Sequence, residues 1–312
     1  MSSEKQIELS NSKRTCFDTC HKKFYYSYLY EDVGLEEKLP PSPLRLGSAI
    51  HTVLMHHYSG ASAEIAVQAG VATYNSIFED IEILITEKEA TAIDKEIAIV
   101  EGFIKPYTDF WADEDAEFKI MATELDLSTS ISPQVRYSGR LDLVVERKGQ
   151  LYVVDHKTLS MFRAPYFNRL HFDYQLTGYA WLAAKHFKQP VGVIYNCIKK
   201  PAIRQKMHET KPEFLARIRD VYDDDPQDYF KRVECVRTLD QINEFKLACA
   251  EVASDMIFAI NSGTNYRRNM ATCDIYSGCI FNGMCVSNTP DLTNFRLRRT
   301  RTEEDVDGND EW

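Results

Sequence analysis

Two runs rich in β-branched residues, 135–145 and 151–158, stand on either side of a Lys148-Gly149 pair. Such runs around a glycine-containing pair are typical of two antiparallel strands joined by a tight turn. A β-hairpin fixes which side chains face each other. For that reason this segment constrains the fold more than any other part of the chain.

The predicted register brings two acidic residues together. A two-residue turn pairs Arg147 with Gln150. Asp142 lies five residues before Arg147, and Asp155 lies five residues after Gln150, so the two carboxylates face each other. Directly opposed residues have Cβ atoms about 4.5–5.5 Å apart. A four-residue turn keeps this register, whereas a three-residue turn removes it. Lys157, two residues beyond Asp155, shares its face.

Leucines and valines flank both carboxylates, and two carboxylates buried together repel each other. A divalent cation removes this conflict, because Mg²⁺ and Mn²⁺ prefer hard carboxylate oxygens as ligands. The alternative is a solvated hairpin end at which Arg140 and Lys157 neutralise the acids. Geometry alone leaves both alternatives open.

Helical and strand patterns alternate along the rest of the chain, which indicates an α/β fold. Helices are predicted over 11–30, 46–60, 172–188 and 238–261, with two or three more inside 61–118. Strands are predicted over 124–131, 135–145, 151–158 and 191–198.

The chain has 312 residues, 44% hydrophobic and 27% charged, which is ordinary for globular proteins. No segment approaches the run of about eighteen apolar residues that a transmembrane helix needs. The first residues lack the apolar run of a signal peptide. We therefore expect a cytoplasmic protein without a membrane partner, whose eight cysteines do not form disulfides.

The net charge of −10 is unevenly distributed. Residues 61–118 carry 14 Asp and Glu against 3 Lys, so the remainder of the chain has a net charge of +1. Basic clusters occur at 22–23, 199–206 and 296–301. A charge pattern of this kind is compatible with a nucleic-acid partner but does not establish one.

The hairpin and three further elements together resemble a known family. Asp142 followed by Asp155-His156-Lys157 resembles the PD-(D/E)XK nuclease superfamily. The RecB-like branch of that superfamily is indicated by a Gly-xxx-His helix, a later Gln-xxx-Tyr helix and a Cys-x-Lys-Lys-Phe-Tyr-like start. These elements are Gly47 to His51, Gln175 to Tyr179, and the segment from Cys20 to Tyr26; the resemblance spans about residues 8–286.

The resemblance implies a restriction-endonuclease-like core, in which a mixed central sheet is flanked by helices. It also implies that Asp142, Asp155, the carbonyl of His156 and His51 hold Mg²⁺ or Mn²⁺. Lys157 would then orient or deprotonate the attacking water. Without the resemblance, His51 is more simply a packed or exposed histidine.

Three further residues receive candidate roles from the resemblance. Glu124 falls where the family often places an acid near the metal, although Asp126 lies on the same strand face. Gln175 and Tyr179 share one helical face because they are four residues apart. They would line the substrate path, or else only join the helix to the sheet.

Iron–sulfur members of the RecB-like branch, such as AddB and CRISPR-adaptation nucleases, hold a [4Fe–4S] cluster with one N-terminal and three C-terminal cysteines. The matching residues here are Cys20, Cys273, Cys279 and Cys285, with Cys16 as the competitor of Cys20. The two five-residue spacings differ from the pairs usual in zinc modules, although Zn²⁺ stays an alternative.

The predicted function is a metal-dependent DNA exonuclease that acts on single-stranded ends in recombination or repair. A helicase, recombinase or integrase would be a separate partner, since no Walker A pattern is present. The alternatives are a spacer-trimming CRISPR-adaptation nuclease, a non-catalytic iron–sulfur module that binds nucleic acid, and a metal-stapled scaffold. The predicted regions are N-terminal helices (1–60), an acidic helical insertion (61–118), the nuclease core (119–210), a helical region with the cysteine cluster (211–290) and a flexible tail (291–312).

Overall fold

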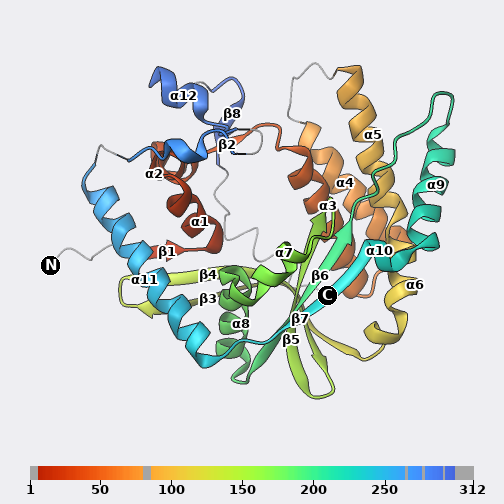
Figure 1. The fold of residues 1–312 in the computed structure, drawn as a ribbon, viewed down its shortest axis with the longest axis horizontal. Helices are drawn as coiled ribbons and strands as arrows, with labels where there is room; N and C mark the ends of the chain where they lie inside the picture. Colours follow the sequence, from red (N-terminus) through yellow and green to blue (C-terminus); the bar gives the residue numbers. More distant parts are fainter. Residues whose placement is uncertain (1–5, 80–85, 264–265, 276–277, 291, 299–312) are drawn as a thin grey trace.

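A six-stranded mixed sheet carries the hairpin (Figure 1). The structure, a computed structural model, describes residues 6–79, 86–263, 266–275, 278–290 and 292–298. The strands are β1 (Ile7–Leu9), β3 (Phe118–Ser132), β4 (Val135–Arg147), β5 (Gln150–Leu159), β6 (Val191–Lys199) and β7 (Phe230–Cys235). Their order is β1–β4–β5–β6–β7, and β3 also pairs with β4. The mixed sheet confirms the predicted α/β class.

Strand β4 is the branch point of this sheet. One edge of β4 pairs with β3 along its length, and the other edge pairs first with β1 and then with β5. The pairing with β1 ends at Tyr137, and the pairing with β5 begins at Leu143. Between Tyr137 and Leu143 this edge of β4 pairs with neither β1 nor β5. We call this gap between β1 and β5 the fork, and Asp142 lies in it.

The turn at Lys148-Gly149 forms as the sequence predicts. Both residues have positive φ angles, 54° and 79°, which matches the turn type that joins twisted antiparallel strands. Arg147 pairs with Gln150, and the register continues to Leu143 and Val154. The predicted register is therefore confirmed for all the paired residues.

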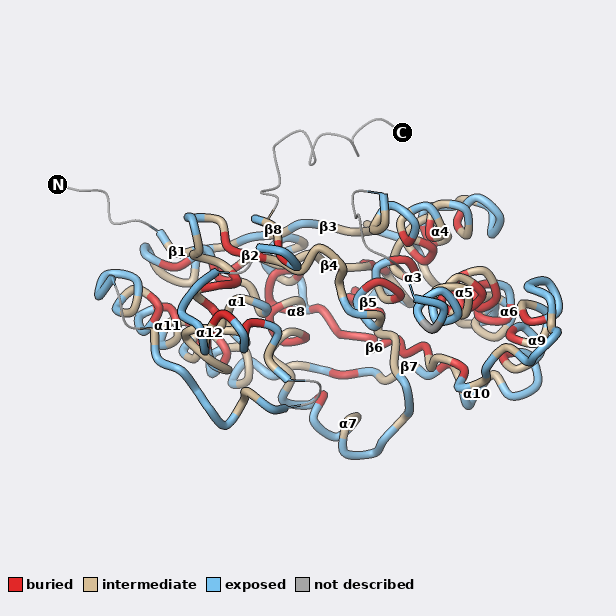
Figure 2. The backbone as a smooth tube through the Cα atoms, turned by 90° about the horizontal axis from the view of Figure 1, so that it is seen from above, coloured by how far each residue is buried: buried red, intermediate tan, exposed pale blue. Residues whose placement is uncertain are grey.

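Helices cover both faces of the sheet (Figure 1). One group packs on the face to which Leu143 and Val145 point, and the other packs on the face of Val144 and Val153. The first group comprises α3 (Ser42–Tyr58), α4 (Ala63–Glu79), α5 (Glu87–Gly102), α6 (Ile104–Asp115) and α9 (Lys211–Asp224). The second comprises α1 (Asn11–Thr19), α8 (Tyr174–Phe187) and α11 (Leu239–Asn261). Figure 2 shows β6 buried between the two groups.

Local sequence explains where several helices begin. Three of them open with a capping box, in which a threonine side chain and a Glu or Gln three residues later satisfy each other's backbone N–H groups. These boxes are Thr86 with Glu89, Thr210 with Glu213, and Thr238 with Gln241. No helix in the described part of the chain is long and apolar enough to cross a membrane.

The predicted helix over 11–30 is interrupted. Cys20 has an extended backbone, with φ −166° and ψ 121°, so α1 ends at Thr19. The Cys20 sulfur accepts a hydrogen bond from the backbone N–H of Asn269, 249 residues later. A tertiary contact therefore replaces the helical continuation. After the interruption come α2 (His21–Phe24), a π-helical turn (Tyr25–Leu29) and a 3₁₀ turn (Tyr30–Asp32).

A segment near the N-terminus lies beside a segment near the C-terminus, where β2 (Leu35–Glu37) and β8 (Phe295–Leu297) meet (Figure 1). The two strands pair antiparallel. Tyr26 stacks on Phe281, and both belong to a small buried cluster that joins the two ends. The other described elements are α7 (Ala164–Asn168), a 3₁₀ turn (Arg169–Phe172), α10 (Pro226–Tyr229), a 3₁₀ turn (Met270–Thr272) and α12 (Asn282–Ser287).

The hairpin turn gives a stability test. Gly149→Ala should lower the free energy of unfolding by about 1–2 kcal/mol, because an L-residue at this positive φ is strained. Lys148→Asn should leave it unchanged or raise it, since asparagine tolerates positive φ better than lysine. Urea unfolding at neutral pH measures both. A Gly149→Ala protein as stable as the wild type would contradict the turn.

Candidate active site

The two carboxylates of the hairpin are both buried at the fork, although they are held differently. The Asp142 side chain is 11% exposed, and the Asp155 side chain is 1% exposed. Asp142 Oδ2 accepts a hydrogen bond of 2.8 Å from the backbone N–H of His156. A side chain of β4 thus binds a backbone group of β5 just beyond the last regular pair.

Asp155 and Lys157 point toward α8. The Lys157 ammonium lies 3.1 Å from Asp155 Oδ2 and 3.2 Å from Oδ1. Gln175 Nε2 lies 3.5 Å from Asp155 Oδ1 and donates to the Tyr179 hydroxyl at 3.0 Å. The four predicted residues on this face therefore form one connected polar group.

Gly139 on β4 makes room for this group. A Cβ atom at Gly139 would lie 2.8 Å from the Tyr179 ring, closer than such atoms approach in folded proteins. The absence of a side chain there lets the Tyr179 ring pack closely against β4.

On the other side of the fork, α3 contributes His51. Its Nε2 lies 2.9 Å from the carbonyl oxygen of His156, and its Nδ1 lies 3.5 Å from Asp142 Oδ1. His51, Glu124 and Asp142 each offer a ligand atom within 4.8 Å of the others. These three side chains, with the His156 carbonyl beside them, have the donor types that a hard divalent cation prefers.

Glu124 reaches this position through an unusual backbone. Its φ is 49°, and it is missing from the pairing of β3 with β4 between Thr123 and Leu125. A non-glycine residue in this conformation costs on the order of 1 kcal/mol, and such strain is concentrated at functional sites. Asp126, the competing acid, is in a bidentate ion pair with Arg140, and Arg140 Nη1 also lies 3.7 Å from Glu124 Oε2.

The pKa values of the two opposed carboxylates diverge. Burial, opposed by Lys157, raises the pKa of Asp155 to about 6. Burial also acts to raise the pKa of Asp142, but the charge and hydrogen bond of His51 outweigh it and hold that pKa below its usual range. Burial lowers the pKa of His51, yet Asp142 outweighs it and raises the value overall. His51 therefore stabilises the negative charge of Asp142, whereas Lys157 balances the charge of Asp155 only in part.

A model of the PD-(D/E)XK nuclease superfamily matches residues 8–286. The chain belongs to the PD-(D/E)XK nuclease superfamily. Its mixed sheet flanked by helices is consistent with the core of that superfamily. None of the curated proteins compared matches the chain.

Two solved structures are similar to this PD-(D/E)XK chain over most of their length. A putative exonuclease from Eubacterium rectale is 11% identical, with a TM-score of 0.47, and the match covers 98% of this chain and 94% of the other. A phage-related exonuclease from Haemophilus somnus 129PT is 12% identical, with a TM-score of 0.28, covering 68% and 94%.

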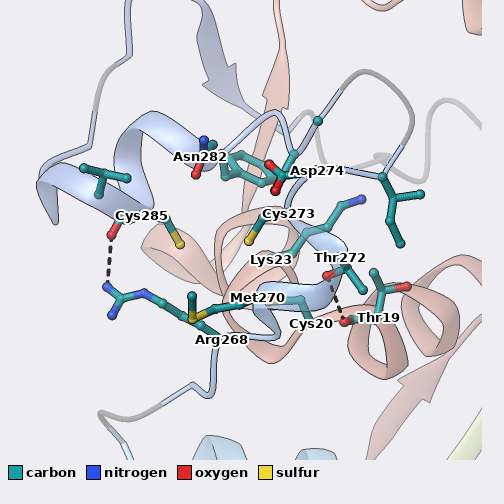
Figure 3. A pocket seen from close by; sticks show the side chains of 15 residues that line it. Thr19, Cys20, Lys23, Arg268, Met270, Thr272, Cys273, Asp274, Asn282 and Cys285 are labelled. Atoms are coloured by element: carbon teal, nitrogen blue, oxygen red, sulfur yellow. Dashed lines mark hydrogen bonds between the residues drawn. The ribbon is translucent and has the colours of Figure 1, made fainter.

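The four predicted cluster cysteines line one cavity of about 850 Å³ between the two ends of the chain (Figure 3). Cys273 and Cys285 direct their sulfur atoms toward the same space. Desolvation, followed by the charges of Cys279 and Cys20, raises the pKa of Cys273. Cys16 lies outside this lining and packs beside the core of α1 and α11.

These sulfurs are not at zinc-binding distance from one another. Among the described residues, no three of them lie within 4.8 Å. A tetrahedral zinc ion with bonds of about 2.3 Å would hold its sulfurs about 3.8 Å apart. The structure therefore gathers the thiols around a cavity without forming a metal-ligand cluster.

The sequence did not reveal a buried network behind His156. His156 Nδ1 lies 2.8 Å from Asn196 Nδ2, and Asn196 contacts the Tyr107 hydroxyl at 3.0 Å. Arg232 on β7 donates to Tyr107 and Tyr58, both at 3.0 Å, and pairs with acids at the end of α6. Strand β7 was not predicted, so no sequence signal placed Arg232 near the hairpin.

The diverging pKa values predict opposite stability effects for the two acids. The folded protein binds the Asp155 proton more tightly than the unfolded chain, whose ordinary value is 3.8. Without metal, this group therefore destabilises the fold progressively as the pH rises from about 4 to about 6. Asp155→Asn keeps the neutral form, so above pH 6 it should be more stable than the wild type by on the order of 2 kcal/mol.

Urea unfolding in EDTA at pH 4 and pH 7.5 measures this difference. Asp142→Asn is the matched control and should be less stable than the wild type at pH 7.5, because His51 loses its partner. The interpretation is wrong if Asp155→Asn is the less stable of the two variants at pH 7.5.

Proposed function

We propose that this chain is a Mg²⁺- or Mn²⁺-dependent deoxyribonuclease. The observation that carries the proposal is the meeting, at the fork of β4 and β5, of a histidine–carboxylate group and an Asp–Lys pair. Membership of a nuclease superfamily gives this arrangement its chemical meaning.

The donor set fits a divalent cation. Asp155 Oδ2 is buried and accepts no hydrogen bond from the described residues, although the Lys157 ammonium lies 3.1 Å away. A buried carboxylate oxygen that accepts no hydrogen bond has lost its hydration without a full replacement, and a bound cation would offset that loss. We assign the metal ligands as His51, Asp142, Asp155 and the carbonyl of His156, with Glu124 beside them. When bound, such an ion activates water and neutralises charge on the phosphodiester.

Lys157 is the residue we assign to the attacking water. Asp155, Asp142 and Tyr179 outweigh the effect of burial on its ammonium and raise its pKa, so Lys157 stays protonated. A protonated ammonium held by Asp155 can donate a hydrogen bond to the water and stabilise negative charge as it develops on the phosphate. In the resting protein it therefore serves as an orienting cation, not as a base.

Gln175 and Tyr179 keep this ammonium in place. Gln175 bridges the Asp155 carboxylate and the Tyr179 hydroxyl, which leaves Asp155 fewer orientations. Burial raises the pKa of Tyr179 to about 12, so the phenol stays neutral and can donate to a substrate phosphate. We assign both to the substrate path.

The substrate we propose is the single-stranded end of a DNA strand, degraded as an exonuclease does in recombination or repair. The resemblance to the RecB-like branch supports a DNA substrate, and a spacer-trimming CRISPR-adaptation nuclease is the alternative within the same branch. Strand separation or integration would need a separate helicase, recombinase or integrase, because the chain has no Walker A pattern.

We also propose that Cys20, Cys273, Cys279 and Cys285 hold a [4Fe–4S] cluster. All four line one cavity, and all eight cysteines of the chain are free of disulfides. A cubane cluster binds its four thiolates to four different irons and so spaces them more widely than a single zinc ion does. We prefer the cluster to Zn²⁺ because of the resemblance to the iron–sulfur members of the RecB-like branch.

Nuclease activity should depend on a divalent ion and on the residues of the fork. Asp142→Ala, Asp155→Ala and Lys157→Ala should each lower the rate at least 100-fold while DNA binding persists. Glu146→Gln, which removes an acid from the same strand but away from the fork, should keep full activity. Release of label from end-labelled single-stranded DNA, with and without Mn²⁺, measures this. Full activity in Asp155→Ala, or binding without any degradation, would overturn the proposal.

The cluster predicts a brown protein after anaerobic purification, with broad absorption near about 400 nm. Cys20→Ser and Cys279→Ser should bleach it, whereas Cys16→Ser and Cys249→Ser should not, because both lie outside the cavity lining. Loss of a link that closes roughly 250 residues should also lower stability by about 4–5 kcal/mol, by analogy with disulfides. Stoichiometric zinc without iron in the purified protein would contradict the cluster and show that the cysteines bind a structural zinc ion.

A further inference from the structure

A second, smaller cavity of about 340 Å³ lies beside the candidate active site. It is formed where α3 and α5 pass the carboxyl ends of β5 and β6. Lys95 from α5, Ser160 after β5 and Lys200 after β6 supply polar groups to its wall, and Leu46 and Ile99 supply apolar ones.

Positive charge converges on this cavity. Lys95 and Lys200 both line it. Partial burial, followed by the charges of Arg204 and Lys200, lowers the pKa of Lys95. Both of these cations therefore lie within electrostatic reach of Lys95. No carboxylate of the described residues lies within 4.0 Å of any of these three charged groups, in contrast to Lys199, which pairs with Asp228.

The nearest acids already have partners. Glu96, in the cavity wall, pairs with Arg45 at 3.4 Å and accepts a hydrogen bond from Tyr74. Asp94 pairs with Lys211 at 2.7 Å, and Glu209 pairs with Arg217 at 2.7 Å. The charge of Glu96 opposes the repulsion at Lys95, but its effect is smaller than that of Arg204 or Lys200. Repulsion among the cations therefore prevails, an arrangement that costs stability unless an anion joins it.

The topology of the sheet explains why the cations meet here. β5 and β6 are parallel neighbours, so the segments that follow them leave from the same edge, and Lys200 N–H donates to the Leu159 carbonyl at 2.8 Å. Residues 158–172 and 197–208 carry six Lys and Arg and no Asp or Glu. In a chain with 47 acidic residues, this edge is distinctly basic.

We propose that this cavity binds a phosphate group of the nucleic-acid strand that enters the active site. Lys95 and Lys200 supply cations from its wall, Ser160 supplies a hydroxyl donor, and Arg204 adds positive charge from outside the lining. The inference rests on the proposed nuclease function and adds to it a second point of contact for the substrate. Lysine ammonium groups and an arginine fork are the usual protein partners of phosphate.

The distance from the fork suits a neighbouring phosphate of the same strand. Ser160 follows Lys157 by three residues of extended chain, or about 10 Å. Leu46 precedes His51 by five residues of helix, or about 7.5 Å. A single strand held at both points would be fixed in direction as well as in position, which an enzyme acting at strand ends requires.

The test measures binding without catalysis. Wild type, Lys200→Gln, Arg204→Gln and the double variant are titrated with a fluorescent single-stranded oligonucleotide in EDTA at several salt concentrations. The double variant should bind roughly ten-fold more weakly. For the double variant, the slope of log K against log salt concentration should be less negative by about 0.7, the value for one lost phosphate contact. Lys185→Gln, which removes an exposed lysine at the far end of α8, should change neither quantity.

Stability separates binding from folding in these variants. Lys200→Gln without ligand should melt at the same temperature as the wild type or higher, because it relieves repulsion between the cations. A lower melting temperature together with unchanged oligonucleotide binding would make Lys200 structural and overturn the inference.

The remaining outcomes distinguish this site from the proposed function. Unchanged binding and salt dependence in the double variant, with cleavage still abolished by Asp155→Ala, would reject the phosphate site and keep the nuclease. Weakened binding without any cleavage by the wild type would keep the site and reject the nuclease. A third outcome is that thymidine 5′-monophosphate raises the melting temperature of the wild type but not that of the double variant, while both proteins bind the oligonucleotide equally. That outcome would reject the strand contact and assign the cavity to a free nucleotide.

Discussion

The burial of Asp155 is the constraint to which the rest of the site responds. This carboxylate is almost completely removed from water, and burial is the largest contribution to its raised pKa. Lys157 and Gln175 compensate only part of that cost. The Asp142 carboxylate, by contrast, lies beside His51 and accepts a hydrogen bond from the backbone N–H of His156, and both interactions stabilise its negative charge. The negative charge of Asp142 is stabilised by its neighbours, whereas that of Asp155 is balanced only in part, and this asymmetry supports the proposed cation site.

The fork in the sheet and the network behind it hold this arrangement rigid. Burial lowers the pKa of His156 to about 3, so its ring is neutral and can accept a hydrogen bond from Asn196. Asn196 in turn accepts from Arg232, which also pairs with Asp115 at the end of α6. The acidic helical region is therefore tied to the peptide whose carbonyl faces His51. A strained Glu124 can be tolerated beside it because the surrounding strands are fixed.

The sequence predicted the parts of the site that depend on local rules. The turn at Lys148-Gly149 determined the register from Arg147–Gln150 to Leu143–Val154. The predicted pair of Asp142 with Asp155 would come next, but the regular pairing ends there and Asp142 accepts a hydrogen bond from the His156 N–H. The four-residue spacing of Gln175 and Tyr179 likewise placed both on one face of α8. These rules depend only on neighbours in the chain, so they survive folding unchanged.

What the sequence could not predict depends on contacts between distant segments. The break at Cys20 requires Asn269, and the positive φ of Glu124 requires the pairing of β3 with β4. Helix α9 is a different case, since its capping box at Thr210 is readable from sequence alone. Arg232 lies on a short strand of mixed polarity, and only the finished sheet reveals that its guanidinium is buried.

The net charge of −10 is a poor guide to what the molecule can bind, because the fold separates the two signs. Most of the acidic excess lies in 61–118. By contrast, the edge formed by the ends of β5 and β6 carries no Asp or Glu in residues 158–172 or 197–208. Lys95 is one of only three lysines in the acidic region, and it lines the basic cavity together with Lys200. A polyanion that approaches the carboxyl end of β5 therefore meets cations first, and the acids of 61–118 discourage it from binding elsewhere. The charge that decides binding is the local one, and at this edge of the sheet it is positive.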